Sequence, residues 1–155
     1  MRHRPLYLNR AALAALFLVA VTLGLPAFGD APFKNARLKI ETQNGQVLLN
    51  VEVADTEPQR EHGLMFRRQL PEDRGMIFLF GDEREITMWM KNTYIPLDMI
   101  FIGNDWHIVH IARDAEPLST DIISSIQPAS RVLEILAGQA DKLGLKPGDS
   151  VSLLR

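Results

Sequence analysis

Cysteine is absent from this sequence of 155 residues. Without thiols the chain can form no disulfide bond, no thiolate metal site and no covalent haem attachment, and it has no cysteine nucleophile. A folded domain in this chain must therefore be stabilised by packing alone.

A basic cluster is also missing once the first 29 residues are set aside. Those residues contain three arginines and no acidic residue, so the formal net charge changes from −2 for the whole chain to −5 for the remainder. Nucleic acids and anionic lipid surfaces are bound by clusters of lysine and arginine. We therefore expect neither of them as a partner.

The common catalytic motifs are absent as well. The sequence contains no Gly-x-Ser-x-Gly elbow, no phosphate-binding loop, no Gly-x-Gly-x-x-Gly fingerprint and no His-Glu-x-x-His helix. We expect no cofactor and no resident metal. An enzyme would depend on isolated acid–base groups.

The first 29 residues have the pattern of a secretory signal peptide. Arg2, Arg4 and Arg10 form a basic start, the run from Ala11 to Leu25 is apolar, and small residues precede a cleavage point after Gly29. An uncleaved anchor is the less favoured alternative, because a spanning helix needs about 20 apolar residues. We expect a periplasmic or secreted protein that meets the membrane only during export.

The part that remains after cleavage has about 125 residues, which is the size of one domain. Residues 30–35 are polar, contain Pro32 and predict a loose N-terminal tail. Residues 36–155 predict a single β-rich domain.

The pair Asn44-Gly45 predicts a β-hairpin, because this pair is preferred at the centre of a type I′ turn. Pairing across that turn sets Ile40 opposite Leu49, on a face that is apolar throughout. The other face then sets Arg37 opposite Glu52. Turn chemistry, apolar pattern and charge thus agree on a hairpin with one buried face.

The rest of the chain predicts short strands with two short helices. A capping box at Thr56 begins a helix that ends near Gly63, and residues 137–143 form the second helix. Residues 131–136 fit a strand or a helix by periodicity alone. Further strands are expected at residues 75–80, 86–90, 97–102, 106–111 and 151–154, with a charged turn at residues 82–85. The pattern predicts a mostly β fold, a small β-sandwich or barrel-like domain with two peripheral helices.

Several of these segments together resemble the family catalogued as domain of unknown function 192, small proteins of bacteria and archaea that are often exported. The resemblance covers residues 36–154. It is carried by Arg60-Glu61-His62-Gly63-Leu64-Met65, Gly75-Met76-Ile77-Phe78, Trp89-Met90-Lys91-Asn92-Thr93, Ile95-Pro96-Leu97-Asp98, Val132-Leu133-Glu134, Ala137-Gly138 and Gly148-Asp149. It implies a compact, mostly β domain and favours a strand at residues 131–136. It implies no reaction, because the family has no established activity.

A group of polar residues between apolar segments is the leading candidate for a ligand-binding site. The group consists of Lys91, Asn92, Thr93 and Asp98 beside Trp89, with Arg60 and Glu61 in support. The structural alternative is that Asn and Thr form a turn, while Lys91 and Asp98 form an ion pair at its end. Both interpretations remain open at this point.

We therefore expect an exported binding module for a small polar or sugar-like ligand, or for an envelope component, with no chemistry of its own. One alternative is a hydrolase-like enzyme that uses Lys91, Asp98 and Glu134 as acid–base groups. If Glu134 is buried, it needs a partner such as Arg60 or Lys91. Another alternative is a copper carrier that uses the thioethers of Met88 and Met90, although methionine more often fills irregular cores.

Overall fold

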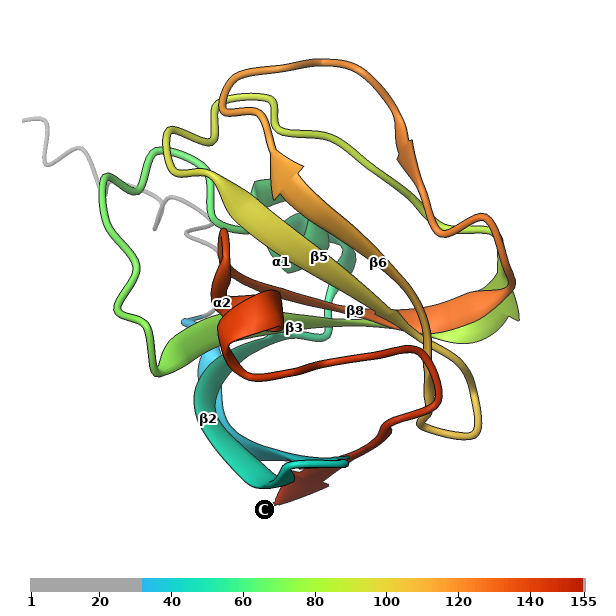
Figure 1. Ribbon diagram of the computed structural model, residues 1–155. Helices are drawn as coiled ribbons and strands as arrows, with labels where there is room; N and C mark the ends of the chain where they lie inside the picture. Colours follow the sequence, from blue (N-terminus) through green and yellow to red (C-terminus); the bar gives the residue numbers. More distant parts are fainter. Residues whose placement is uncertain (1–31, 155) are drawn as a thin grey trace, which may run out of the picture.

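The computed structural model describes residues 32–154, and most of the ordered elements in this range are β-strands (Figure 1). The predicted signal peptide lies outside the described residues. The strands are β1 (Lys34–Thr42), β2 (Gly45–Ala54), β3 (Arg74–Arg84), β4 (Thr87–Met88), β5 (Leu97–Ile102), β6 (Ile108–Ala115), β7 (Ile123–Ser124), β8 (Ala129–Leu136) and β9 (Ser150–Leu154). The helices are α1 (Glu57–His62) and α2 (Gln139–Lys142).

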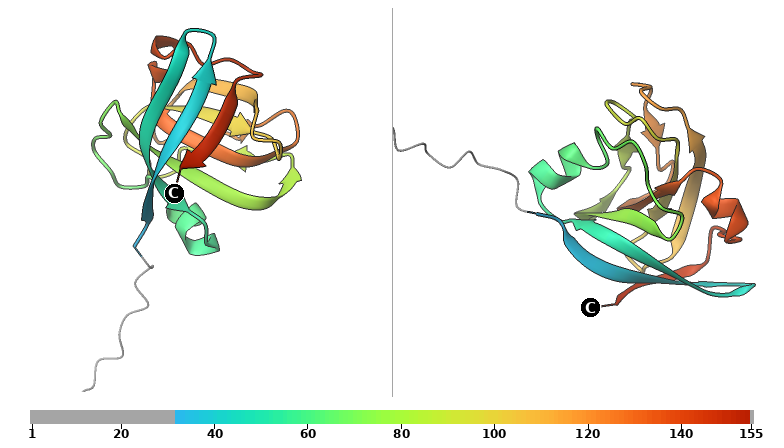
Figure 2. Two further views of the ribbon diagram at one scale, coloured as in Figure 1. Left: turned by 90° about the horizontal axis from the view of Figure 1, so that it is seen from below. Right: turned by 90° about the vertical axis from the view of Figure 1, so that its left-hand side faces the viewer.

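Seven strands form one sheet in the order β6-β5-β8-β3-β2-β1-β9, and β4 pairs with β7 in a separate two-stranded sheet. Only β2 and β3 are parallel neighbours in this seven-stranded sheet, and α1 lies in the crossover that joins them. The sheet curves so that β1, β2 and β9 lie across from β5 and β8 (Figures 1 and 2). Within the described chain its two edge strands, β6 and β9, form no ladder; an isolated bridge between His107 and Ser150 and the backbone hydrogen bonds beside it join them only at one end. The sheet is therefore not closed into a barrel, and the fold is sandwich-like.

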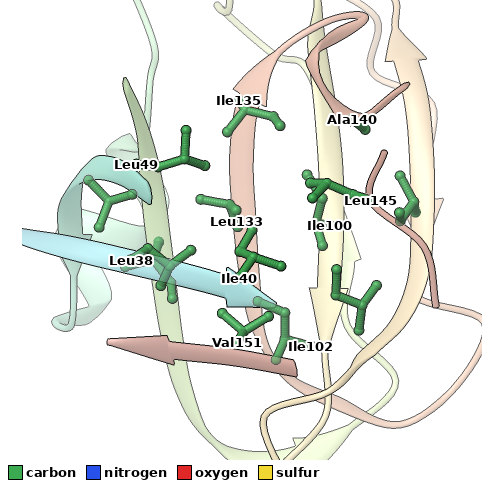
Figure 3. Close-up of a cluster of buried hydrophobic side chains, with 14 of the residues drawn as sticks. Leu38, Ile40, Leu49, Ile100, Ile102, Leu133, Ile135, Ala140, Leu145 and Val151 are labelled. Carbon is green, nitrogen blue, oxygen red and sulfur yellow. The ribbon is translucent and has the colours of Figure 1, made fainter. Parts of the chain in front are cut away.

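The space inside the curved sheet is filled by the first of two hydrophobic cores. Leu38 and Ile40 of β1 lie there across from Leu133 and Ile135 of β8 and from Ile100 of β5 (Figure 3). Successive side chains of a strand point to opposite faces, so each central strand supplies this core with every second residue.

The second core lies on the opposite face of the same central strands. Met76 and Phe78 of β3, Phe101 of β5 and Val132 of β8 belong to it. This two-sided burial confirms that residues 75–80 form a central strand. Glu134 follows Val132 by two residues on β8, so its side chain lies on the same face of the sheet as this second core.

The hairpin of β1 and β2 has the predicted buried face, but its register differs from the prediction. The observed pairs are Thr42–Gly45, Ile40–Val47, Leu38–Leu49 and Arg37–Asn50. The predicted pairing of Ile40 with Leu49 and of Arg37 with Glu52 is therefore wrong by two residues. A shift of two keeps every side chain on its face, so Leu38 and Ile40 stay fully buried.

The hydroxyl of Thr42 explains this register. It accepts a hydrogen bond from the Asn44 amide at 3.1 Å and donates one to the Gly45 carbonyl oxygen at 2.8 Å. These bonds centre the turn on Gln43 and Asn44 instead of Asn44 and Gly45. Only Gly45, with φ of 121°, has a positive φ in this turn, whereas a type I′ turn requires two such residues.

The remaining elements largely follow the sequence. The capping box at Thr56 and the helix end at Gly63 are confirmed, and residues 131–136 are part of a strand. Residues 82–84 continue β3 and do not form a turn, and the strand predicted at 86–90 is reduced to the two residues of β4. Two residues of the predicted tail, Lys34 and Asn35, already belong to β1. No helix within residues 32–154 is long and apolar enough to cross a membrane.

Asp98 joins three elements of the fold. It lies on β5 with 1% of its surface exposed. Its Oδ1 accepts a hydrogen bond from the Asp114 amide of β6 at 2.9 Å, and its Oδ2 accepts one from the Ala140 amide of α2 at 2.9 Å. The carboxyl group therefore accepts a hydrogen bond from a free amide in the first turn of α2. The N-cap residue of this helix, Gly138, has no side chain that could accept it.

Replacing Asp98 by alanine should lower the free energy of unfolding by about 2–4 kcal/mol, because the buried Ala140 amide and the part-buried Asp114 amide would lose their acceptor. Denaturant unfolding measures the difference. The exposed Asp121 is the matched control, and Asp121→Ala should change stability by less than about 0.5 kcal/mol. Equal effects of the two substitutions would contradict the structural role of Asp98.

Candidate functional site

A cavity of about 290 Å³ opens between α1, the end of β3 and the segment that follows β4. Six candidate residues from the sequence line it together: Arg60, Glu61, Met88, Trp89, Thr93 and Glu134. Three other candidates for the ligand-binding site, Lys91, Asn92 and Asp98, are not part of its lining. The structure thus divides the predicted group into two parts.

Helix α1 places Arg60 and Glu61 on one wall. Its N-terminus is fixed by the Thr56 side chain, which accepts a hydrogen bond from the Gln59 amide. Arg60 Nη1 donates to the carbonyl oxygens of Asp55 at 3.1 Å and Leu79 at 3.0 Å. Arg60 thereby holds the helix against β3, while Glu61 is exposed at the rim.

Trp89 forms an exposed part of the opposite wall, with 47% of its surface accessible. The Nζ atom of Lys91 lies 5.3 Å from the centroid of its ring, which is cation–π distance. Lys91 therefore interacts with the site only through the indole. The charge of Lys91 forms no ion pair among residues 32–154.

Asn92 and Thr93 hold the wall in place. Asn92 has a positive φ of 57°, its carbonyl oxygen accepts a hydrogen bond from the Phe66 amide at 2.8 Å, and its Nδ2 donates to Met65 Sδ at 3.8 Å. These contacts tie the loop after β4 to the segment after α1. Thr93 is buried and its Oγ1 donates to the Lys91 carbonyl oxygen at 3.3 Å.

Glu134 is the unusual residue of the cavity. It lies on β8 between Met76 of β3 and Met99 of β5, and 4% of its surface is exposed. Within the described part of the chain, its carboxyl group forms neither an ion pair nor a hydrogen bond. The expected pairing with Arg60 is not formed, because the Arg60 guanidinium is bonded to backbone carbonyls.

Desolvation controls the protonation of Glu134. Burial disfavours the charged form and raises the pKa of its carboxyl group to about 8, with no charged neighbour to oppose the shift. At neutral pH the group is therefore mostly protonated. A protonated carboxyl group can donate one hydrogen bond, and here that donor faces a cavity.

Sequence reasoning missed the contribution of β3. Phe80 and Arg84 line the cavity, and the Arg84 guanidinium lies 5.5 Å from the centroid of the Phe80 ring. The charged residues after Gly81 had predicted a turn, whereas Arg84 is an exposed residue at the end of β3 that also lines the cavity. The signal that could have placed it is Gly81, whose φ of 85° marks an irregularity within the strand.

The methionine pair is divided as well. Met88 is half-buried and lines the cavity, whereas Met90 is fully buried in the second core. Met90 could reach a metal ion only if the core rearranged. Residues 32–154 contain no cluster of three or more His, Cys, Asp or Glu side chains suited to a metal ion.

Comparisons with known proteins agree with this architecture. A crystal structure of a Sinorhizobium meliloti protein, provisionally described as a transcription regulator, is similar with a TM-score of 0.77 and 45% identity, over 81% of this chain and 98% of that chain. A protein of unknown function from Novosphingobium aromaticivorans is similar with a TM-score of 0.75 and 38% identity, over 77% of this chain and 86% of that chain.

A comparison with curated proteins found no match. The model of the DUF192 family, described as "Uncharacterized ACR", matches residues 39–153, which include every element of the cavity. The chain therefore belongs to the DUF192 family, domain of unknown function 192.

Proposed function

We propose that this protein is an exported binding module that holds a small polar or sugar-like ligand, free or part of the cell envelope, in the cavity between α1 and β3. The observation that carries the proposal is the carboxyl group of Glu134, a largely buried residue that lines the cavity and has no hydrogen-bond partner within residues 32–154. Burying a polar group without a hydrogen bond costs free energy. A ligand that supplies the missing partner would recover this cost.

The surroundings of Glu134 support a binding role. Aromatic rings of Trp89 and Phe80 provide apolar contact area, and Thr93 and the carboxyl group provide polar contacts. Apolar and aromatic surface combined with directed polar groups is typical of small-molecule sites, and here the polar share of the lining is large. The volume of about 290 Å³ suits a small ligand.

The hydrolase alternative has less support. It needed Lys91, Asp98 and Glu134 together, but only Glu134 lines the cavity. Both carboxyl oxygens of Asp98 already accept hydrogen bonds from backbone amides. The copper alternative has less support as well, because Met90, one of its two ligands, is fully buried in the second core.

A binding screen tests the proposal. Neutral sugars, amino sugars, sugar acids and amino acids are added to the isotope-labelled protein, and nuclear magnetic resonance follows the Trp89 indole and the Thr93 amide. We expect at least one compound to shift both resonances. Trp89→Ala should weaken its binding about fivefold or more, because the stacking surface is lost.

Tyr94 offers a matched control for this screen. It is exposed to a similar degree, at 42% against 47% for Trp89, but does not line the cavity. Tyr94→Ala should leave binding unchanged. The proposal is overturned if no compound shifts the cavity resonances, or if the two substitutions weaken binding equally.

Stability as a function of pH tests the state of Glu134. Its pKa is raised in the folded protein from 4.5 to about 8, so the folded state keeps a proton that the unfolded state releases. The stabilisation by this proton is complete below about pH 4.5 and is lost as the pH rises to about 8. Relative to Glu134→Gln, the free energy of unfolding should fall by about 5 kcal/mol across that range.

Denaturant unfolding at several pH values, carried out on the wild type and Glu134→Gln in parallel, measures this difference. If the difference in free energy of unfolding between the two proteins stays constant from about pH 4 to about pH 9, Glu134 has a partner or is solvated, and its pKa is not raised.

The proposal that the protein is exported rests on the signal-peptide pattern of residues 1–29. Expression of the full chain in a bacterial host should yield a protein outside the cytoplasm that begins at or near Asp30. Intact mass and N-terminal sequencing of the fractionated protein check this. Recovery of a chain that retains Met1 would contradict it.

A further inference from the structure

The charged groups that line the cavity balance one another when Glu134 carries its proton. Helix α1 supplies two carboxylates and one guanidinium, β3 supplies a second guanidinium, and His62 is the remaining titratable group. The four charged residues are Glu57, Glu61, Arg60 and Arg84. The segment from β4 to Thr93 adds no charged residue to the lining. The cavity therefore has no net charge that would attract a cation or an anion.

The polar groups of the cavity also differ in what they can still bind. Arg60 Nη1 and the Thr93 hydroxyl already donate to backbone carbonyl oxygens. The carboxyl group of Glu134 has no partner in the described chain, and in its neutral form it offers an O–H donor. The complementary group on a ligand is an oxygen that accepts a hydrogen bond.

The size and shape of the cavity restrict the ligand further. A volume of about 290 Å³ is at the small end of the range for ligand sites. Trp89 presents a flat, half-exposed indole on the same cavity. A single saccharide ring has one apolar C–H face that can lie on such a ring, and its hydroxyl or amide oxygens can accept a hydrogen bond.

We propose that the cavity binds an uncharged ligand the size of a monosaccharide, through an oxygen atom that accepts a hydrogen bond from the carboxyl group of Glu134. This inference rests on the function proposed above and narrows its polar ligand to an uncharged class. An ionised Glu134 has no donor to offer. Affinity should therefore be constant at low pH and fall about tenfold for each pH unit above the pKa of Glu134.

Three sugars with the same ring size test the charge preference. N-acetylglucosamine is uncharged and has an amide oxygen, glucosamine carries an ammonium group in its place, and glucuronic acid carries a carboxylate. Titrations at about pH 6 keep the three sugars uncharged, positively charged and negatively charged, respectively. The readout is again the resonances of the Trp89 indole and the Thr93 amide. N-acetylglucosamine should bind about tenfold more tightly than the two charged sugars.

Two substitutions at Glu134 separate a hydrogen-bond donor from a negative charge. Glu134→Gln keeps an N–H donor, so it should weaken binding of N-acetylglucosamine only about two- to fivefold and abolish the pH dependence. Glu134→Met keeps the apolar volume without a donor and should weaken binding about tenfold or more. Thermal melts establish that both variants are folded. Because both remove a buried ionisable group, neither is expected to unfold the protein.

The outcomes distinguish this inference from the proposed function. If glucosamine binds more tightly than N-acetylglucosamine, or if Glu134→Gln loses binding as fully as Glu134→Met, the ligand pairs with a carboxylate and the uncharged class is wrong, while a binding function stands. If none of the three sugars shifts the cavity resonances, the saccharide-sized uncharged ligand is ruled out. The proposed function then depends on the remaining compounds of the wider screen.

Discussion

Burial of both faces of the central strands β3, β8 and β5 is the constraint on which the rest of this structure depends. One face forms the core inside the curved sheet, and the other packs beneath α1 and the long loops. The strands must also lie close together. A Cβ atom on Gly75 would lie 2.5 Å from the carbonyl oxygen of Glu134, so glycine at this position permits the contact of β3 with β8. The cavity is the place where the second core is incomplete, between α1 and the segment after β4.

A carboxyl group at this incomplete edge has a different environment from the apolar residues around it. Glu134 alternates with Leu133 and Ile135, which pack on the opposite face, so the geometry of β8 directs it into the second core. Its neighbours across the sheet are Met76 and Met99. Because no cation is close enough to compensate, desolvation alone sets its protonation. Such a perturbed group in a cavity is a physical reason to look for function there.

The two acidic candidates on central strands show how similar residues can have opposite roles. Asp98 is as buried as Glu134, but both its oxygens accept amides that would otherwise lack partners. Asp98 thus belongs to the architecture, and Glu134 to the cavity. A sequence pattern cannot separate them, because both stand in apolar runs. Likewise, the sequence grouped Lys91 with Asp98, although Lys91 lies on the Trp89 ring.

The sequence by itself determined the local elements: the capping box of α1, the central strands with two apolar faces, and the buried face of the hairpin. These depend on side-chain periodicity and on short-range hydrogen bonds, which the order of residues specifies directly. It also indicated the segments that form the cavity, with Arg60, Glu61, Trp89 and Thr93 among them. The register at Thr42 was missed although the hydrogen bonds that set it are local. Only the tertiary structure decided the extension of β3 to Arg84 and the assignment of Asp98 and Glu134 to different roles. Each of these depends on which distant backbone groups or charges come within hydrogen-bonding distance, and that is settled only when the two faces of the sheet are packed.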